Sequence, residues 1–283
     1  MKKLVSFIAI FLLGIIRLNA AYDHVFIVML ENVGYDPIVG DVTDAPYINN
    51  TLIPQGTLYS QHYGITHPSE PNYLALFSGS TQGVTNDDCT PTNGPFPGPN
   101  LYSRLNRHGI SIQGYMETMP SNGFTGCSSG LYAEKHNPFP FFINVPTTAW
   151  VIYSGPYPSD FNWPSFVWIS PNLVDDMHNG ATLADQISNG DSWLSVNLPP
   201  IIQFCNAHNG LLILTMDEGD NPASLNHIFT VLIGPGIAQG AINSMMFNHY
   251  NTLKTITDNF GVRALGNSVG LPGLFCIDCE NLP

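Results

Sequence analysis

The sequence predicts an α/β fold, an α/β/α sandwich around a largely parallel central sheet. Apolar, β-rich runs alternate with segments of helical character, the pattern of parallel sheets covered by helices on both faces. Three of the apolar runs end abruptly in acidic and amide side chains, and ligands collect beyond the carboxyl ends of such strands. Because no internal repeat or long linker divides the chain, residues 21–283 are expected to form one domain.

Buried strands are expected where apolar runs are continuous, without the alternation of half-exposed strands. These runs are residues 24–30, 165–170, 211–216 and 228–233, and a further strand is expected over 110–116. Helices are expected over 45–55, 100–108, 193–208 and 252–260. The third helix is expected to be interrupted near Pro199 and Pro200, because proline lacks the helical N–H. Residues 120–164 are expected to be mostly loop.

Residues 66–73 (THPSEPNY) place a hydroxyl, an imidazole, a carboxylate and an amide between two prolines. An apolar run follows and ends at Gly79, which predicts a loop that turns into a short helix with Ser69 at its N-cap. Because a helix N-terminus binds anions, a hydroxyl at that point lies where a phosphate would bind. Ser69 is therefore either only a helix cap or a residue that meets a phosphate.

Residues 1–20 have the composition of a secretory signal peptide. A basic start is followed by an apolar run over 4–16 and a small residue, Ala20, at a plausible cleavage point. The run is too short to span a bilayer, and the alternative is an uncleaved interfacial anchor. The mature protein is expected to be secreted or periplasmic, with no stable membrane insertion.

The charge balance is strongly acidic. The chain has 8 Lys and Arg against 21 Asp and Glu. Loss of Lys2, Lys3 and Arg17 with the signal leaves five cations against 21 acids, a formal charge of −16. Such a surface repels nucleic acid, so a nucleic-acid partner is not expected. A phosphorylated substrate would have to be held largely by metal cations, backbone N–H groups and protonated His.

Five cysteines follow the signal, so at least one is unpaired within the chain. Cys89 and Cys127 lie in loop-like sequence rich in Gly, Pro and Ser and are the first candidates for a pair. Cys276 and Cys279 are candidates to close a small loop, with zinc binding as the weaker alternative. Cys205 lies in an apolar helical stretch and is expected to be buried and unreactive.

Polar clusters at three strand ends predict a metal site. The clusters are Glu31 with Asn32, Asn172 with Asp175 and Asp176, and Asp217 with Glu218. Converging carboxylates repel one another unless a cation lies between them. Because carboxylate and amide oxygens suit hard cations, Mg²⁺, Ca²⁺ or Mn²⁺ is expected rather than Zn²⁺.

Five ordered motifs resemble those of the phosphoesterase family of secreted acid phosphatases and phospholipases C. They are Leu30-Glu31-Asn32, residues 66–73, Asp176-Met177-His178, Asp217-Glu218-Gly219 and Asn248-His249-Tyr250. The likeness is strongest to secreted acid phosphatases that act on phosphatidylinositol 3-phosphate, and it extends from about residue 24 to 261. Cys89 and Cys127 match a cysteine pair of these relatives. The resemblance implies an alkaline-phosphatase-like fold and a small phosphorylated substrate or a phosphoinositide head group.

The resemblance also implies roles for individual residues. Residues 69–72 resemble the nucleophile turn of nucleotide pyrophosphatases, with Ser in place of Thr, and Asp217-Glu218-Gly219 resembles their metal turn, with Glu in place of His. Glu31 matches a metal-binding Asp after the first strand. The positions of a second metal's ligands are those of Asn172, Asp175, Asp176 and His178, where Asn172 stands for an acid, so one or two ions are implied.

The mechanism expected is attack of Ser69 Oγ on phosphorus, a phosphoserine intermediate, and its hydrolysis by water. Charge on the phosphoryl oxygens is expected to be stabilised by the metal, the N–H groups after Ser69, and the amides of Asn72 or Asn86. The candidates to protonate the leaving oxygen or to bind phosphate are His67, His178 and His249. The remaining histidines, His136 among them, are expected to be structural.

Three alternatives to a phosphomonoesterase remain open. A phospholipase C-type phosphodiesterase would use the same site with a different pocket. Residues 126–130 (GCSSG) fit the G-x-S-x-G pattern of esterases, which needs a strand before Ser128 and a helix after it. A non-catalytic binding protein would capture its ligand equally well without the Ser69 hydroxyl.

Overall fold

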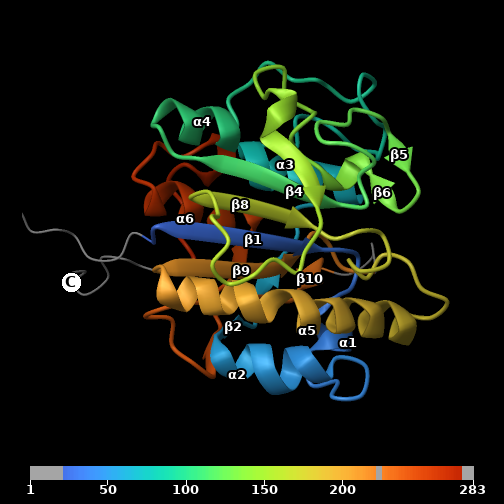
Figure 1. Cartoon of the computed structure of the whole chain (residues 1–283), viewed down its shortest axis with the longest axis vertical. Coiled ribbons are helices and arrows are strands. Elements are labelled where there is room, and N and C mark those ends of the chain that lie inside the picture. Colours follow the sequence, from blue (N-terminus) through green and yellow to red (C-terminus); the bar gives the residue numbers. More distant parts are fainter. Residues whose placement is uncertain (1–21, 221–224, 276–283) are drawn as a thin grey trace, which may run out of the picture.

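An eight-stranded sheet forms the centre of the computed structural model, which describes residues 22–220 and 225–275 (Figure 1). Its strands, in spatial order, are β12 (Ala241–Asn243), β2 (Thr57–Tyr59), β11 (Thr230–Ile233), β9 (Gly210–Met216), β1 (His24–Leu30), β8 (Phe166–Ser170), β4 (Ile112–Glu117) and β7 (Trp150–Tyr153). The expected signal peptide and the pair Cys276 and Cys279 lie outside the described residues.

The sheet is largely parallel, as predicted. Strands β9, β1, β8, β4 and β7 run in one direction, whereas β11 is antiparallel to both β9 and β2. In the register of the central strands, Ile27 of β1 lies between Trp168 of β8 and Ile213 of β9. The carboxyl ends of β9, β1 and β8 therefore meet at one edge, where the polar clusters follow them.

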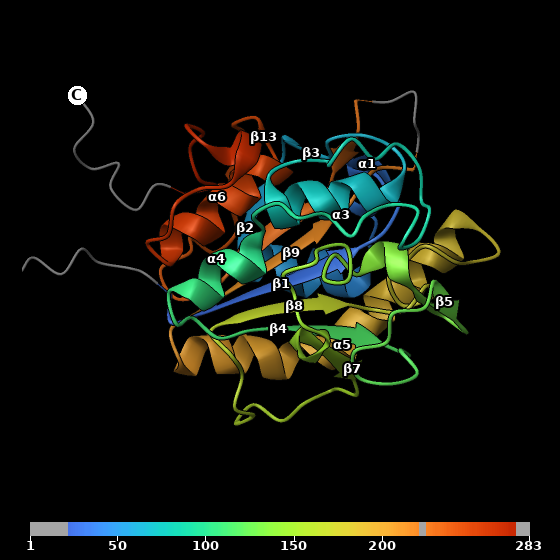
Figure 2. The ribbon, with the colours of Figure 1, turned by 90° about the horizontal axis from the view of Figure 1, so that it is seen from above.

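Each face of the sheet packs against its own helices, because the side chains of a strand alternate between the two faces. On β1, Val25 and Ile27 enter one hydrophobic core, and Phe26 and Val28 enter the other. Helices α3 (Ser69–Ser78), α4 (Leu101–Arg107) and α6 (His249–Asn259) cover the first face. Helix α5 (Leu183–Ala207) covers the opposite face (Figure 2), together with α1 (Tyr35–Ile38) and η1 (Ile48–Leu52).

The predicted helices are present, but α5 begins at Leu183, where Thr182 caps it, ten residues before the expected start at 193. Residues 45–55 contain η1, a π-helix, followed by α2 (Ile53–Gln55), and α6 starts three residues early because Asn248 caps it. The interruption expected near Pro199 and Pro200 is wrong, since α5 runs on through both prolines. Pro199 is exposed, and Ser195, whose carbonyl loses its helical partner there, is also exposed and available to water.

The expectation of loop over residues 120–164 is wrong in part. Strand β7 lies inside this stretch and extends the sheet beside β4, and two one-turn 3₁₀ helices, η2 (Glu134–His136) and η3 (Thr147–Ala149), precede it. The predicted strand over 228–233 is divided at Phe229 into β10 (His227–Ile228) and β11. Further short elements are β3 (His62–Tyr63), β5 (Ser128–Ser129), β6 (Tyr132–Ala133), β13 (Phe247–Asn248) and η4 (Gly266–Ser268).

The cysteines that the structure describes behave as the sequence predicts. Cys89 and Cys127 form a disulfide that joins two loops 38 residues apart. Cys205 is buried and unpaired, and burial raises the pKa of its thiol. Across residues 22–220 and 225–275, none of the helices has both the length and the apolar composition that crossing a bilayer would require.

Candidate active site

The carboxylates that follow β1 and β9 lie side by side at the carboxyl edge of the sheet. The N–H of Asp217 donates to the carbonyl of Leu30, and the N–H of Asn32 donates to Asp217 Oδ1 at 3.0 Å. Asp217 Oδ1 also accepts the N–H of Glu218 at 2.6 Å. Since Glu31 and Asp217 are fully buried and Glu218 nearly so, the sheet register brings three acidic groups into one water-poor region.

Ser69 points into this group of carboxylates. Its Oγ lies 2.9 Å from Glu31 Oε2 and 3.1 Å from Glu218 Oε1, so its proton can be donated to either acid. The prediction that Ser69 is the N-cap is wrong: Pro68 occupies that position without a side-chain cap, and Ser69 is the first residue of α3. The hydroxyl therefore forms hydrogen bonds with the acidic cluster rather than capping the helix.

The start of α3 offers fewer donors to an anion than the sequence predicts. The N–H of Glu70, the first after Ser69, is already bound to Asp87 Oδ1 at 3.0 Å, and Pro71 has no N–H. Asp87 belongs to the loop that the disulfide at Cys89 anchors. Charge on a phosphoryl group at Ser69 must then be balanced by side chains or a cation.

Glu31 connects the largest number of site residues in this region. Besides Ser69, its carboxylate accepts a hydrogen bond from the Tyr73 hydroxyl and lies 3.1 Å from His136 Nε2. The rings of Tyr73 and His136 stack in parallel with centroids 5.5 Å apart. The other imidazole nitrogen, His136 Nδ1, lies 3.1 Å from Asp176 Oδ2. Glu31 is thus fixed in place from two sides.

The electrostatics of the group favour a bound cation. Burial raises the pKa of Glu31 and of Glu218 to about 8 and, together with the charge of Glu31, raises the pKa of Asp217. Asp217 Oδ2 is buried and accepts no hydrogen bond from the part of the chain that the structure describes. An unpaired buried carboxylate oxygen beside two further acids is costly, and a divalent cation would offset most of their negative charge. The residues present therefore fit a metal ion.

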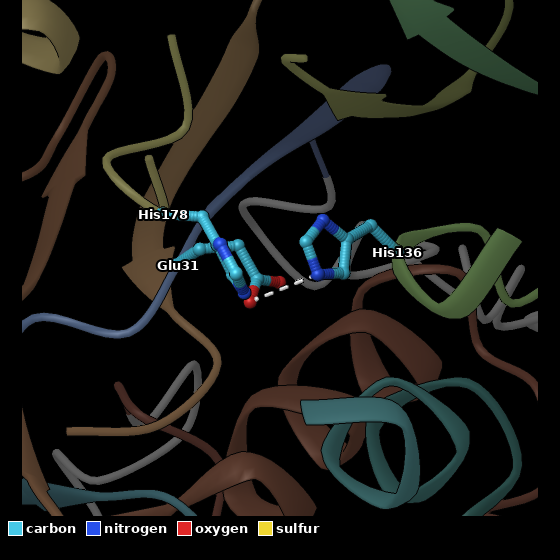
Figure 3. Close-up of side chains that lie close together, drawn as sticks. All are labelled: Glu31, His136 and His178. Carbon is cyan, nitrogen blue, oxygen red and sulfur yellow. Dashed lines mark ion pairs between the residues drawn. The ribbon is translucent and has the colours of Figure 1, made fainter. Parts of the chain in front are cut away.

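A second donor set shares Glu31. Its carboxylate, His136 and His178 each offer a ligand atom, and these atoms lie within 4.8 Å of one another (Figure 3). The figure shows both imidazole rings approaching the Glu31 carboxylate. This set combines one oxygen donor with two nitrogen donors. Imidazole nitrogens are typical ligands of zinc, whereas carboxylate oxygens are typical ligands of magnesium. An expectation of Mg²⁺, Ca²⁺ or Mn²⁺ that is based on oxygen ligands alone therefore does not apply to this mixed set.

The residues expected to bind a second ion do not form one group. The amide of Asn172 donates to Asp175 Oδ2 at 2.5 Å and to Glu117 Oε2 at 3.0 Å, and its Oδ1 accepts from the following turn. Asp176 instead faces His136, and its backbone carbonyl accepts the N–H of Glu31. Burial raises the pKa of Asp176 to about 7.

His178 lies beside a lysine that the sequence reasoning did not single out. Its Nε2 is 3.2 Å from Lys135 Nζ, and its Nδ1 is 3.0 Å from Asn179 Oδ1. Lys135 Nζ also forms an ion pair of 3.1 Å with Asp87. Burial alone would lower the pKa of Lys135, but Glu31 and Asp87 outweigh it and raise that pKa above its ordinary value. The site therefore contains a permanent positive charge.

The other two candidate histidines, His67 and His249, contact neighbouring residues of the acidic cluster, Glu218 and Asp217. His67 Nδ1 is in ion-pair contact with Glu218, and its side chain is 24% exposed, so it reaches both the cluster and the solvent. His249 is fully buried, and its Nε2 lies 2.6 Å from the carbonyl oxygen of Asp217. Burial lowers the pKa of His249 to about 4. This geometry fits a residue that positions Asp217.

The two amides expected to bind substrate are both engaged elsewhere. Asn72 accepts the N–H groups of Ile65 and Thr66 and donates to the carbonyls of Thr66 and Pro68, so all four of its positions are used. Asn72 thus shapes the loop before Ser69. Asn86 is exposed and bonded to Asp88 and Asn93. Its neighbour Asp87 is the residue of this loop that reaches the site.

His136 and Lys135 are the residues that the sequence analysis missed. Both lie in η2, inside the stretch expected to be loop, and His136 was expected to be structural. The sequence offered one indication, since Glu134, Lys135 and His136 form the most highly charged triplet of an otherwise aromatic stretch.

The esterase-like motif has the wrong structural context. Ser128 is exposed in β5, which pairs with β6 in a small hairpin, and the preceding Cys127 is in the disulfide. The next element after β5 is the hairpin strand β6 rather than a helix, so the strand–turn–helix geometry of a nucleophile elbow is not formed there. Ser69 is the serine whose hydroxyl meets the buried acids.

Sequence comparison places this site in a known family. The model of the phosphoesterase family matches residues 44–263, most of the chain and most of the site. The chain belongs to the phosphoesterase family. Membership makes it a hydrolase that acts on phosphoric ester bonds, as the resemblance predicted.

Curated relatives of this phosphoesterase include phosphatases. A phosphatidylinositol-3-phosphatase of Mycobacterium tuberculosis is 39% identical over 254 residues, which cover 89% of this chain and 81% of the relative. A probable acid phosphatase of Kluyveromyces lactis is 29% identical, and an acid phosphatase of Aspergillus fumigatus is 28% identical. The match spans 89% and 88% of this chain but only 61% and 57% of the two fungal proteins.

Solved structures confirm the expected fold. A protein of the alkaline phosphatase superfamily from Vibrio parahaemolyticus superposes with a TM-score of 0.61, covering 89% of this phosphoesterase and 70% of that chain at 13% identity. A murine ectonucleotide pyrophosphatase/phosphodiesterase gives a TM-score of 0.59, covering 86% and 96% at 10% identity. At these identities the likeness establishes the alkaline-phosphatase-like fold alone.

Proposed function

We propose that this phosphoesterase is a metal-dependent phosphomonoesterase that works through a phosphoserine on Ser69. The observation that carries the proposal is the position of the Ser69 hydroxyl, within hydrogen-bonding distance of two buried carboxylates, Glu31 and Glu218. A hydroxyl in such a setting can lose its proton and act as a nucleophile. The related phosphatases support the choice of monoester substrates, and the mycobacterial relative makes a phosphoinositide head group a candidate.

Glu31, Asp217 and Glu218 are the residues that we propose hold the ion, because these three buried acids lie together and Asp217 Oδ2 has no hydrogen-bond donor among the described residues. His136 and His178 complete the alternative set around Glu31. When bound, a divalent cation would lower the pKa of the Ser69 hydroxyl and offset charge on the phosphoryl oxygens. Removal of all metal followed by single additions of Mg²⁺, Ca²⁺, Mn²⁺ and Zn²⁺ distinguishes the oxygen set from the mixed set.

The chain's own groups account for the proton movements. Ser69 Oγ attacks phosphorus, its proton passes to Glu31 or Glu218, and the bond from phosphorus to the leaving oxygen breaks. We propose His67 as the group that protonates the leaving oxygen, because it contacts Glu218 and is partly exposed. Water then attacks the phosphoserine and gives a proton to His67, the Ser69–phosphorus bond breaks, and Ser69 recovers its proton from Glu31 or Glu218.

Turnover of a phosphomonoester by Ser69→Ala tests this function. We expect a loss on the order of 10³-fold or more, as for other nucleophile deletions, with the fold intact. Ser128→Ala is the matched control, because this exposed serine belongs to the esterase-like motif and lies outside the acidic cluster. A Ser69→Ala variant that keeps most of its activity would show that Ser69 is not the nucleophile.

We also propose that the enzyme is exported, with cleavage after Ala20. The basic, apolar and small-residue segments of residues 1–20 support this, and the disulfide between Cys89 and Cys127 suits an oxidising compartment. N-terminal sequencing of the protein recovered outside the cytoplasm should begin at Ala21. Recovery with Met1 in place would contradict the proposed cleavage.

A further inference from the structure

Lys135 places an ammonium group beside the acidic cluster of an otherwise strongly acidic protein. Its Nζ is 3.2 Å from His178 Nε2, and His178 offers a nitrogen within 4.8 Å of a Glu31 carboxylate oxygen. Glu31 Oε2 in turn lies 2.9 Å from Ser69 Oγ. A series of contacts through two side chains, His178 and Glu31, therefore connects the positive charge with the proposed nucleophile.

Lys135 is also held in position and accessible. Its ion-pair partner Asp87 bonds through the other carboxylate oxygen to the N–H of Glu70, the residue after Ser69. The pair thus ties the ammonium group to the start of α3. Within η2, Glu134 and His136 are buried, whereas 19% of the Lys135 side chain is exposed, so a ligand that enters from solvent can reach it.

The charge of the substrate decides how much such a group contributes. A phosphomonoester carries close to two negative charges at neutral pH, and a phosphodiester carries one. With a divalent ion in place, the carboxylates of Glu31, Asp217 and Glu218 would keep a net negative charge that repels both substrates, and the dianion more strongly. A fixed ammonium group at the rim of the cluster offsets this repulsion most for the substrate with the larger charge, and it can donate to a non-bridging oxygen.

We propose that Lys135 is a specificity-determining residue, whose ammonium group binds a non-bridging phosphoryl oxygen and favours dianionic phosphomonoesters over monoanionic phosphodiesters. The proposal rests on the phosphatase function proposed above. It assigns to this chain's own lysine the discrimination between the two substrate classes that the shared Ser69 site leaves open.

The test compares two substrates on the metal-saturated enzyme. For Lys135→Met we expect kcat/KM for 4-nitrophenyl phosphate to fall by about 10- to 100-fold, the worth of one charged hydrogen bond. For bis(4-nitrophenyl) phosphate, kcat/KM should change by less than about 3-fold. The inhibition constant of inorganic phosphate should rise by a factor similar to the fall in kcat/KM for the monoester. Lys135→Arg should restore most of the monoester preference.

Lys254→Met is the matched control, because Lys254 has the same 19% side-chain exposure and an aspartate partner, Asp258, but lies on α6. Lys254→Met should change kcat/KM for neither substrate. An equal loss for both substrates in a folded Lys135→Met, or in Lys135→Gln if Met does not fold, would overturn the proposal. A wild type that turns over diesters at least as well as monoesters would overturn it too. A wild type that hydrolyses neither ester would instead refute the proposed function.

Discussion

The hydroxyl oxygen of Ser69 lies 2.9 Å from Oε2 of Glu31, although the two residues are 38 positions apart in the sequence. Glu31 directly follows β1 in the middle of the sheet, and Ser69 is the first residue of α3, one of the helices that cover one face of it. The fold alone therefore brings the proposed nucleophile to the proposed metal-binding edge. It makes the acidic cluster, rather than the helix cap, the environment that sets the chemistry of Ser69.

Tyr73→Phe should weaken metal binding more than it weakens the fold. The change removes the hydrogen bond to Glu31 but keeps the ring that stacks on His136. Loss of such a supporting bond lowers metal affinity by about 10- to 100-fold, measured by isothermal titration calorimetry. Tyr59→Phe is the control, because this buried hydroxyl donates to the Leu274 carbonyl. Each variant should lose about 1–2 kcal/mol of unfolding free energy, and only Tyr73→Phe should lose metal.

The metal-free protein should become less stable as the pH rises from about 5 to 8. Glu31 and Glu218 have pKa values near 8 in the folded chain, above the ordinary value of 4.5, so the folded state binds more protons than the unfolded state in this range. Each such carboxyl would lower the free energy of unfolding by at most about 1.4 kcal/mol per pH unit. Urea unfolding of the chelated protein measures this. A stability that rises across the range would contradict the assignment.

Metal should reverse that trend, because the ion competes with protons for the same oxygens. The gain in melting temperature on adding metal should therefore increase from pH 5 to pH 8. A gain that is constant with pH would show that the ion binds away from Glu31 and Glu218.

His249→Gln should make the protein less sensitive to acid. Burial lowers the pKa of His249 to about 4, below its ordinary value of 6.5, so the unfolded state binds the extra proton between these values. The stability that neutral His249 contributes is lost as the pH falls through this window. The glutamine amide can keep a donor near the Asp217 carbonyl without that titration. His208→Gln, at the exposed residue that follows α5, is the control substitution.

Removal of the disulfide should affect substrate binding as well as stability. Cys89 anchors the loop whose Asp87 pairs with Lys135 and with the N–H of Glu70. Cys89→Ser with Cys127→Ser should cost about 2–4 kcal/mol of unfolding free energy. If the loop positions Lys135, KM for a phosphomonoester should also rise while a phosphodiester is less affected. A loss of stability with unchanged KM would separate the loop from the site.

The sequence predicted the parts of this molecule that repeat a local pattern. The continuous apolar runs of β1, β8 and β9 identify buried strands, and the acids that follow them meet at one edge because parallel strands share a direction. Membership of the phosphoesterase family and the disulfide were predicted from motifs as well. The strands and their shared edge depend on nearest neighbours in sequence or on the register of one sheet, whereas the disulfide joins residues 38 positions apart.

What the sequence could not predict depends on contacts between distant segments. His136 and Lys135 lie in a short 3₁₀ turn without periodicity, and only the packing of η2 against α3 brings them to Glu31 and His178. The position of Ser69 was predicted wrongly for the same reason. In the sequence, an N-cap serine and a first helical serine look alike, and only the carboxylates at the sheet edge distinguish them. Asn72 and Asn86 have side-chain amides that could bind a phosphate, but these amides form hydrogen bonds with backbone groups and with loop side chains instead.

Trapping of the covalent intermediate tests the central claim most directly. Acid quenching of the wild-type enzyme during turnover of a phosphomonoester, followed by mass spectrometry of its peptides, should find one phosphate on Ser69. The same experiment on Ser69→Ala should find no phosphorylated peptide and no turnover. Phosphate on another residue, or turnover without a phosphorylated Ser69 under conditions that trap phosphoserine, would contradict the proposal that Ser69, held by Glu31 and Glu218, accepts the phosphoryl group.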